Sequence, residues 1–343
     1  MALTRREFLF TVPLVAGVVL GCGAGNQQSS SAQPLVEIAT SSPGAAEART
    51  ILVCMPETTQ TKEVWKGLSD ELSRDYKLVA VRVERSSDAP LIAEGIKRYR
   101  PDGLVLMNNP TVTAYQDLQK NTHALDFPPA VIVMTSFVER ESNRLISATG
   151  ISYEVPLITV MTNLRKLVQL KQERVGVVVR APLREFVGKQ VALAKREKVV
   201  VTQESVSPDP NPSEIKRAIR RLKESADVLW ILNDDRLLTP KLLAEGWLPG
   251  LDERPWLPTI VGAGSLVSPE RSFGTFAVLP DHVALGAQAA SMIMDIADRG
   301  WTIEPGSSVQ LPLSTTTTMD LSQVKERFAM QQDALQQVDR ILE

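Results

Sequence analysis

Short apolar runs alternate with amphipathic segments from residue 49 onward, and this alternation constrains the fold more than any other feature of the chain. Runs of this length are typical of buried strands, whereas the amphipathic segments have the 3.6-residue period of helices that cover a sheet. The alternation predicts an α/β fold with parallel sheets and helices on both faces. At 343 residues the chain is long enough for about two such domains, so we expect two similar lobes.

The predicted elements fall into two series. The first series has strands at residues 51–55, 77–83, 103–107 and 130–134, with helices at 62–74, 89–99 and 112–121. The second has strands at 174–179, 199–204, 228–232 and 259–262, with helices at 155–170, 183–196, 212–223 and 240–245. Each series describes one Rossmann-like lobe.

The N-terminal segment is interpreted as an export signal. Arg5 and Arg6 directly precede an apolar run over residues 8–20, which is shorter than the roughly 20 residues needed to span a bilayer. The run ends in Val19-Leu20-Gly21-Cys22, which resembles a lipobox. We therefore expect residues 1–22 to be a signal peptide with a lipobox. Cys22 would carry diacylglycerol and an amide-linked acyl chain such as palmitate. The arginine pair resembles a twin-arginine signal, but general secretion also accepts many such peptides.

These features predict an exported lipoprotein anchored to the cell membrane or the outer membrane through Cys22. Residues 23–48 are small and polar over most of their length, so they are expected to form a flexible tether. The other cysteine, Cys54, lies in an apolar strand pattern and is interpreted as a buried structural thiol.

Several functional classes find no support in the sequence. The formal net charge is −2 and the basic residues are dispersed, so no nucleic-acid partner is expected. His123 and His282 have no cysteine or carboxylate neighbours at metal-ligand spacing. The chain also lacks a Gly-x-Ser-x-Gly elbow and the glycine-rich phosphate and dinucleotide motifs. We therefore predict no enzymatic activity, no catalytic residue, no metal and no cofactor, and we interpret His282 as a capping or hinge residue.

A family resemblance rests on motifs that occur in order along residues 50–328. They include the segment 148–156 (Ala-Thr-Gly-Ile-Ser-Tyr-Glu-Val-Pro), the segment 226–234 (Ala-Asp-Val-Leu-Trp-Ile-Leu-Asn-Asp) and the segment 276–281 (Phe-Ala-Val-Leu-Pro-Asp). Together they resemble the ABC transporter substrate-binding proteins related to tryptophan and tyrosine binders. The resemblance implies a type I periplasmic binding fold, in which three crossovers join two lobes and a solute binds in the cleft.

The resemblance also implies how the chain is divided. Lobe 1 would comprise residues 49–150 plus 275–305, and lobe 2 would comprise residues 151–274 plus 306–343. The crossovers would fall near residues 147–155, 274–280 and 304–312, and the helix at 282–297 would pack on lobe 1. In such folds, solutes bind outside the carboxyl ends of the strands.

Polar residues that follow the predicted strands are the candidate ligand contacts. They are Thr58, Asn109, Thr111 and Thr135 in lobe 1, and Asp234 and Ser265 in lobe 2. The alternative interpretation is helix capping, because the same residue types are favoured at helix N-termini whatever the function. One loop departs from the family pattern. Residues 136–143 are charged and contain no glycine, where the family usually has a Gly-Asp-Pro loop, and this leaves the ligand class open.

The sequence therefore predicts a lipid-anchored receptor that delivers a small molecule, such as an amino acid, to an ABC permease. The alternative is a related lipoprotein that serves as a sensor, with a sensor protein as its partner, or as an envelope scaffold without transport.

Overall fold

The structure is a computed structural model that describes residues 34–41, 48–122, 126–170, 173–267, 270, 273–304, 306–331 and 333–343. The predicted signal peptide, Cys22 and most of the predicted tether lie outside these residues, and so does His123. Residues 35–343 form one compact unit. Within the described part of the chain, no helix combines the length and apolar character needed to cross a bilayer.

The first sheet has six described strands in the order β1-β3-β2-β4-β5-β6. All neighbouring strands are parallel except β1, which pairs antiparallel with β3. The strands are β1 (Glu37–Ser41), β2 (Arg49–Met55), β3 (Tyr76–Arg82), β4 (Gly103–Met107), β5 (Ala130–Val133) and β6 (Ala148–Gly150).

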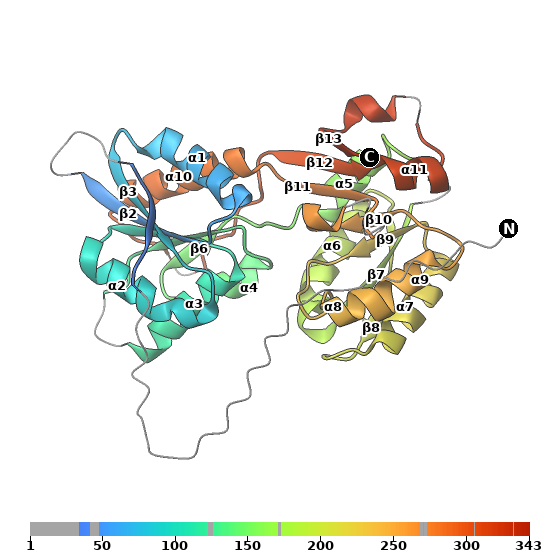
Figure 1. Cartoon of the computed structure of the whole chain (residues 1–343), viewed down its shortest axis with the longest axis horizontal. Coiled ribbons are helices and arrows are strands. Elements are labelled where there is room, and N and C mark those ends of the chain that lie inside the picture. Colours follow the sequence, from blue (N-terminus) through green and yellow to red (C-terminus); the bar gives the residue numbers. More distant parts are fainter. Residues whose placement is uncertain are drawn as a thin grey trace, which may run out of the picture. The chain divides into compact units, whose positions relative to one another are not determined.

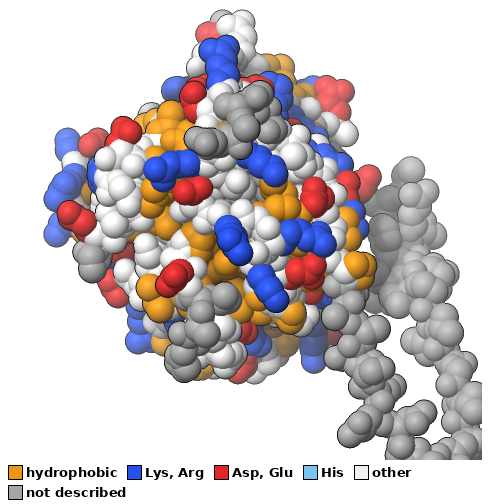
Figure 2. Space-filling view, turned by 90° about the vertical axis from the view of Figure 1, so that its left-hand side faces the viewer, with side chains coloured by type: hydrophobic (Ala, Val, Ile, Leu, Met, Phe, Trp, Pro, Cys, Tyr) orange, Lys and Arg blue, Asp and Glu red, His pale blue; other side chains and the backbone are white. Residues whose placement is uncertain are grey.

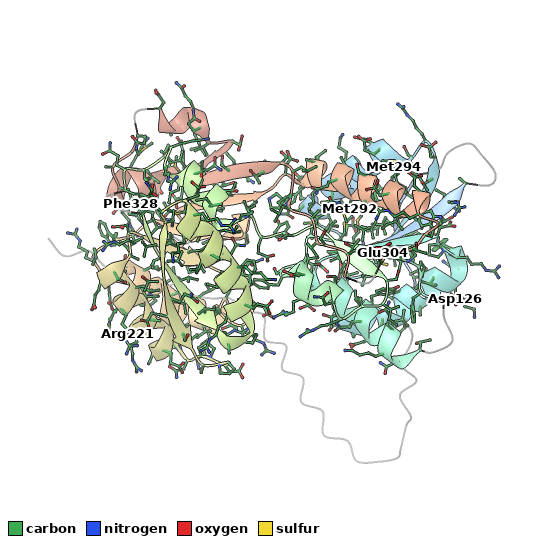
Figure 3. The ribbon with its side chains drawn as sticks, turned by 180° about the vertical axis from the view of Figure 1, so that it is seen from behind. Asp126, Arg221, Met292, Met294, Glu304 and Phe328 are labelled. Atoms are coloured by element: carbon green, nitrogen blue, oxygen red, sulfur yellow. The ribbon has the colours of Figure 1, made fainter. Side chains whose placement is uncertain are left out.

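Helices cover both faces of this sheet. Figure 1 shows α1 (Thr59–Leu72) and α10 (His282–Asp298) on one face and α2 (Ala89–Tyr99) and α3 (Asn109–Asn121) on the other. Apolar side chains of the strands point alternately into the two resulting cores, and Met292 of α10 (Figure 3) is buried in the first of them. The short helix α4 (Val138–Ser142) follows β5, and the 3₁₀ turn η1 (Ser86–Asp88) precedes α2.

Glycines let α1 and α10 pack in close contact. A Cβ atom at Gly67 would lie 1.9 Å from the carbonyl oxygen of Val283, and one at Gly286 would lie 2.1 Å from that of Val64. Because real Cβ atoms do not approach backbone so closely, these two positions require glycine. The contact holds α10 on the first lobe, although α10 follows a strand of the second sheet.

The second sheet has seven described strands in the order β13-β12-β11-β10-β9-β7-β8, parallel except for the antiparallel pair of β11 and β12. The strands are β7 (Arg174–Arg180), β8 (Val200–Val206), β9 (Val228–Ile231), β10 (Thr259–Val261), β11 (Phe276–Pro280), β12 (Thr315–Asp320) and β13 (Arg340–Leu342). Most of these strands are apolar and buried, as expected for a sheet covered on both faces.

Two hydrophobic clusters flank the second sheet. One is formed with α5 (Leu157–Leu164), α6 (Arg184–Arg196) and α11 (Leu321–Arg327), and Phe328 packs against it (Figure 3). The other is formed with α7 (Pro212–Ser225), α8 (Pro240–Leu242), the π-helical turn η3 (Leu243–Trp247) and α9 (Leu248–Asp252). The 3₁₀ turns are η2 (Ala181–Leu183), η4 (Gly264–Leu266) and η5 (Ala334–Gln337).

The predicted α/β architecture is confirmed, and three details need correction. Residues 37–41 form β1, so this part of the predicted tether is a strand on the edge of the first sheet. Strand β11 belongs to the second sheet, so residues 276–280 do not join lobe 1, and the second crossover follows Pro280. Helix α5 ends at Leu164, where the predicted helix continues to residue 170, because Val168 instead forms an isolated bridge with Met330.

Cys54 is fully buried in β2. Burial raises the pKa of its thiol to about 12, because a thiolate would be desolvated there. The thiol therefore stays protonated and unreactive, as the apolar strand pattern predicted.

Candidate functional site

A cavity of ≈ 940 Å³ is lined by residues of both lobes. Its lining includes residues one or two positions after β2, β4 and β10, so the cavity opens at the carboxyl ends of parallel strands. Hydroxyl groups are frequent in the lining, and they belong to Thr58, Thr59, Ser265, Thr316 and Thr318. Charged side chains, among them Glu63, Glu270 and Arg340, also face it. The cavity is therefore suited to a polar small molecule, since such clefts are the usual solute sites of α/β folds.

Three side chains from separate segments form a hydrogen-bonded chain on the wall of this cavity. The hydroxyl of Tyr153 lies 3.0 Å from Nε2 of His282, and Nδ1 of His282 lies 2.9 Å from a carboxylate oxygen of Glu63. Burial raises the pKa of Tyr153 to about 12, so its phenol stays protonated and can donate to the imidazole. The two contacts are compatible when Nε2 accepts from the phenol and Nδ1 donates to the carboxylate.

This hydrogen-bonded series of side chains links two of the crossovers to α1. Tyr153 lies between β6 and α5, His282 begins α10 directly after β11, and Glu63 lies on α1. His282 is the first residue of α10 and follows the second crossover, and the N-cap of α10 is Asp281, which accepts a hydrogen bond from the Ala284 amide. The sequence pattern gave no sign that Tyr153 and Glu63 would be its partners.

Two of the predicted ligand residues line the cavity from opposite lobes. Thr58 is the N-cap of α1, where its hydroxyl accepts a hydrogen bond from the Thr61 amide. Ser265 lies in the turn that follows β10. Both residues are exposed toward solvent, so a solute could contact both at once.

Three other predicted residues have structural partners instead. Thr111 and Thr135 are fully buried, and their hydroxyls donate to the backbone oxygens of Val83 and Val133 at 3.4 Å and 3.3 Å. Asn109 binds the backbone of Ser136 on both sides, since its Oδ1 accepts from the Ser136 amide at 3.0 Å and its Nδ2 donates to the Ser136 carbonyl at 3.4 Å. None of the three lines the cavity.

Asp234 is held by an arginine. Arg180 Nε and Nη2 donate to the two carboxylate oxygens of Asp234 at 2.7 Å and 2.6 Å, and the Asp234 side chain is 2% exposed. Arg180 also donates to the Pro208 carbonyl, and Asp234 accepts a hydrogen bond from the Arg236 amide. The ion pair of Arg180 and Asp234 joins the carboxyl ends of β7 and β9. In the described structure Asp234 therefore has a structural role.

Sequence reasoning missed two residues on the other side of the interlobe region, Phe137 and Glu154. The Glu154 carboxylate accepts hydrogen bonds from the Phe137 amide at 3.0 Å. Although part of the residue is exposed, the carboxyl group itself is desolvated, and this burial raises its pKa to about 7. The unusual charged loop 136–143 was the one signal in the sequence that pointed to this region.

Two further features of the described ranges bear on the kind of site, metal-ligand groups and surface charge. No group of three or more His, Cys, Asp or Glu side chains within the described ranges could hold a metal ion. On the face shown in Figure 2, blue basic and red acidic side chains are interspersed, and no large patch of one charge appears.

The sheet order, with a reversed strand in the second sheet and three passages of the chain between Rossmann-like lobes, defines a type I periplasmic binding fold. Solved structures of this class resemble the chain over nearly all of the described part.

One such structure is an ABC domain in complex with L-Trp from Streptococcus pneumoniae, which is 15% identical; the match covers 86% of this chain and 100% of that chain with a TM-score of 0.55. Another is the ligand-free, open structure of a substrate-binding protein with adhesive properties from Clostridium difficile. It is 13% identical, and the match covers 86% of this chain and 99% of that chain with a TM-score of 0.61.

A conserved domain protein from Vibrio cholerae is 17% identical, with 86% of this chain and 99% of that chain covered and a TM-score of 0.53. At these identities the likeness establishes the fold. No family model matches the chain, and no curated protein matches it.

Proposed function

We propose that this protein is an exported, lipid-anchored solute-binding protein of an ABC-type importer, and that it binds a small polar molecule between its lobes. The observation that carries the proposal is the cavity of ≈ 940 Å³ lined by both lobes. Its volume lies within the range of about 300 to 1,000 Å³ that is typical of small-molecule sites. Charged and hydroxyl side chains in its lining favour a solute with charged or hydroxyl groups, such as an amino acid.

Ligand-induced stabilisation tests the binding step. A chain that starts at Pro34, which keeps β1, is screened by thermal unfolding against amino acids, including L-Trp, and against sugars and polyamines. A bound solute should raise the free energy of unfolding by about 2.7 kcal/mol at one hundred times its Kd. Thr58→Val and Ser265→Ala are expected to reduce this gain, because each removes a hydroxyl from the cavity wall. If no solute in the screen shifts the unfolding transition, the sensor or scaffold role is favoured instead.

The lipid anchor is tested at its proposed attachment site. Cys22→Ala should abolish incorporation of labelled palmitate and release the protein from the membrane fraction, because the thiol that receives the lipid is gone. The matched control is Cys54→Ala, which removes the buried thiol and should leave labelling unchanged. Palmitate that still enters the Cys22→Ala protein would rule out the proposed anchor.

A further inference from the structure

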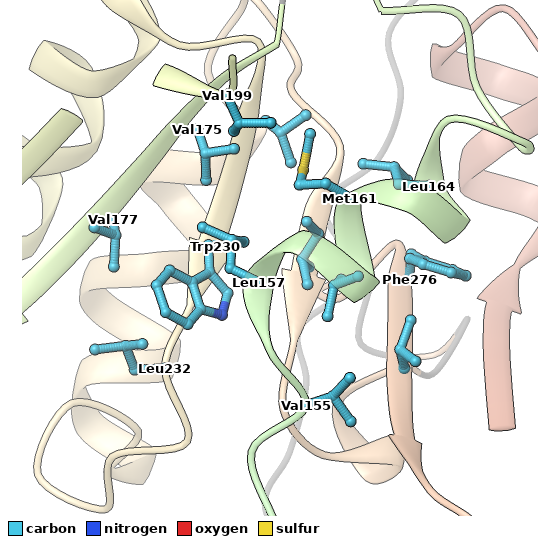
Figure 4. Packing of buried hydrophobic residues seen from close by; sticks show 14 of the residues in the cluster. Val155, Leu157, Met161, Leu164, Val175, Val177, Val199, Trp230, Leu232 and Phe276 are labelled. Atoms are coloured by element: carbon cyan, nitrogen blue, oxygen red, sulfur yellow. The ribbon is translucent and has the colours of Figure 1, made fainter. Parts of the chain in front are cut away.

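The segment 136–139, which follows β5 and includes the first two residues of α4, reaches from the first lobe into the second. Phe137 is 8% exposed and belongs to the hydrophobic cluster of the second sheet, although it follows a strand of the first. Its ring packs edge to face against Phe186 of α6, with the ring centroids 5.2 Å apart. Phe186 in turn contacts Trp230 of β9 at 6.1 Å, and Figure 4 shows Trp230 beside Leu157 in the same cluster.

Polar contacts flank this aromatic contact on both sides. Nδ2 of Asn233, at the end of β9, donates to the Ser136 hydroxyl at 2.9 Å. Nζ of Lys189 on α6 donates to the Glu139 carboxylate at 2.7 Å. Since Ser136 is fixed to the first lobe through Asn109, these contacts join the two lobes through one short segment.

The backbone of the segment is held in an unfavourable conformation. Phe137 has φ 57°. The left-handed region is sterically unfavourable for a residue with a side chain, so it persists only where the surroundings fix it. Here the Glu154 carboxylate accepts from the Phe137 amide, and Val138 packs over Gly150, where a Cβ would lie 2.9 Å from it. The segment is thus built to present the Phe137 ring to the second lobe.

On its side toward Glu154 and Trp230, the Phe137 ring leaves almost no free space. Beside Phe137, Glu154 and Trp230 the remaining void is only ≈ 30 Å³, enough for about one water molecule. The polar cavity of ≈ 940 Å³ lies apart from this contact, since Phe137 does not line it. On its other side the ring borders a cavity of ≈ 300 Å³, which Phe186 and Lys189 also line.

We infer that the Phe137 side chain occupies the space between the lobes and keeps them docked in the solute-free protein. We call this contact between Phe137 and the second lobe the latch. The ring takes the place of an apolar ligand group against Phe186, which in turn contacts Trp230, and the contacts of Ser136 and Glu139 align it. Because Phe137 does not line the polar cavity, a solute can bind there while the ring stays in place. This inference goes beyond the proposed function, because it holds for an importer component and for a scaffold alike.

Distance measurements between spin labels on the two lobes test the latch in the full-length protein. Labels are attached to cysteines introduced at the exposed positions Lys97 on α2 and Arg217 on α7. The native chain should give one narrow interlobe distance distribution without any added solute. Phe137→Ala should broaden that distribution at least twofold, because the aromatic contact between the lobes is lost.

The matched control is Phe273→Ala, which removes a buried phenylalanine that packs against Trp247 within the second lobe. It should leave the distribution narrow. If Phe137→Ala does not fold, Phe186→Ala removes the partner ring and should broaden the distribution in the same way. A folded Phe137→Ala protein with the native distribution, or equal broadening in Phe273→Ala, would overturn the latch. A failed solute screen would not alter these distances, so the two proposals can fail separately.

Discussion

Replacement of Asp234 by alanine should lower the free energy of unfolding by about 3 to 5 kcal/mol. The substitution leaves the Arg180 guanidinium, whose side chain is 11% exposed, without its carboxylate partner. A buried charge that loses its partner keeps its desolvation penalty, and no electrostatic attraction remains to offset it. Urea unfolding monitored by the tryptophan fluorescence of the chain measures the change.

A second ion pair provides the matched control. Arg220 and Glu253 also form a bidentate contact, at 2.8 Å and 2.6 Å, but their side chains are 61% and 39% exposed. Because water solvates either partner alone, Glu253→Ala should change stability far less than Asp234→Ala. Equal effects of the two substitutions would show that burial of the Arg180 pair is not what stabilises the second sheet.

Much of the fold could be predicted because local patterns encode it. The helix at residues 89–99 and the strand at 103–107 have the predicted bounds, since amphipathic period and apolar run length are local properties. Strand β1 could not be predicted in this way. Its residues alternate only weakly between half-buried and exposed, and the strand forms because β3 offers an unpaired edge. Such a partner, far along the chain, leaves no signal in the strand itself.

The candidate site could be predicted only in part, because one residue type serves several purposes. Thr58 caps a helix and also lines the cavity, whereas Thr111, with the same hydroxyl, is buried against backbone. Asp234 lies just after the carboxyl end of its strand, where ligand residues are expected. Both of its carboxylate oxygens, however, accept hydrogen bonds from Arg180 of a neighbouring strand. Only the tertiary arrangement distinguishes these cases. Phe137 is a further example, since its position in the second-lobe core depends on contacts between lobes.

Glu154 should make the stability of the protein depend on pH between about 5 and 8. Burial, opposed by hydrogen bonds from Phe137 and Ser152, raises the pKa of its carboxyl group from 4.5 to about 7. Below pH 4.5 the group is protonated in both the folded and the unfolded chain, so its full contribution to stability is present. As pH rises toward 7 the unfolded chain loses the proton first, and the free energy of unfolding falls by up to about 3 kcal/mol in all.

Glu154→Gln should remove this fall, because glutamine resembles the protonated acid and cannot ionise. The measurement is urea unfolding of both proteins at pH 5, 6, 7 and 8. The free energy of unfolding of the native protein should decrease over this range relative to that of Glu154→Gln, and the variant should be the more stable of the two at pH 8. Glu197→Gln, a change at an exposed glutamate after α6, serves as the control and should keep the native pH dependence. Parallel curves for the native protein and Glu154→Gln would show that this carboxyl group titrates alike in the folded and unfolded chain. In that case the hydrogen bonds from Phe137 and Ser152, together with the charge of Arg140, would offset its burial completely.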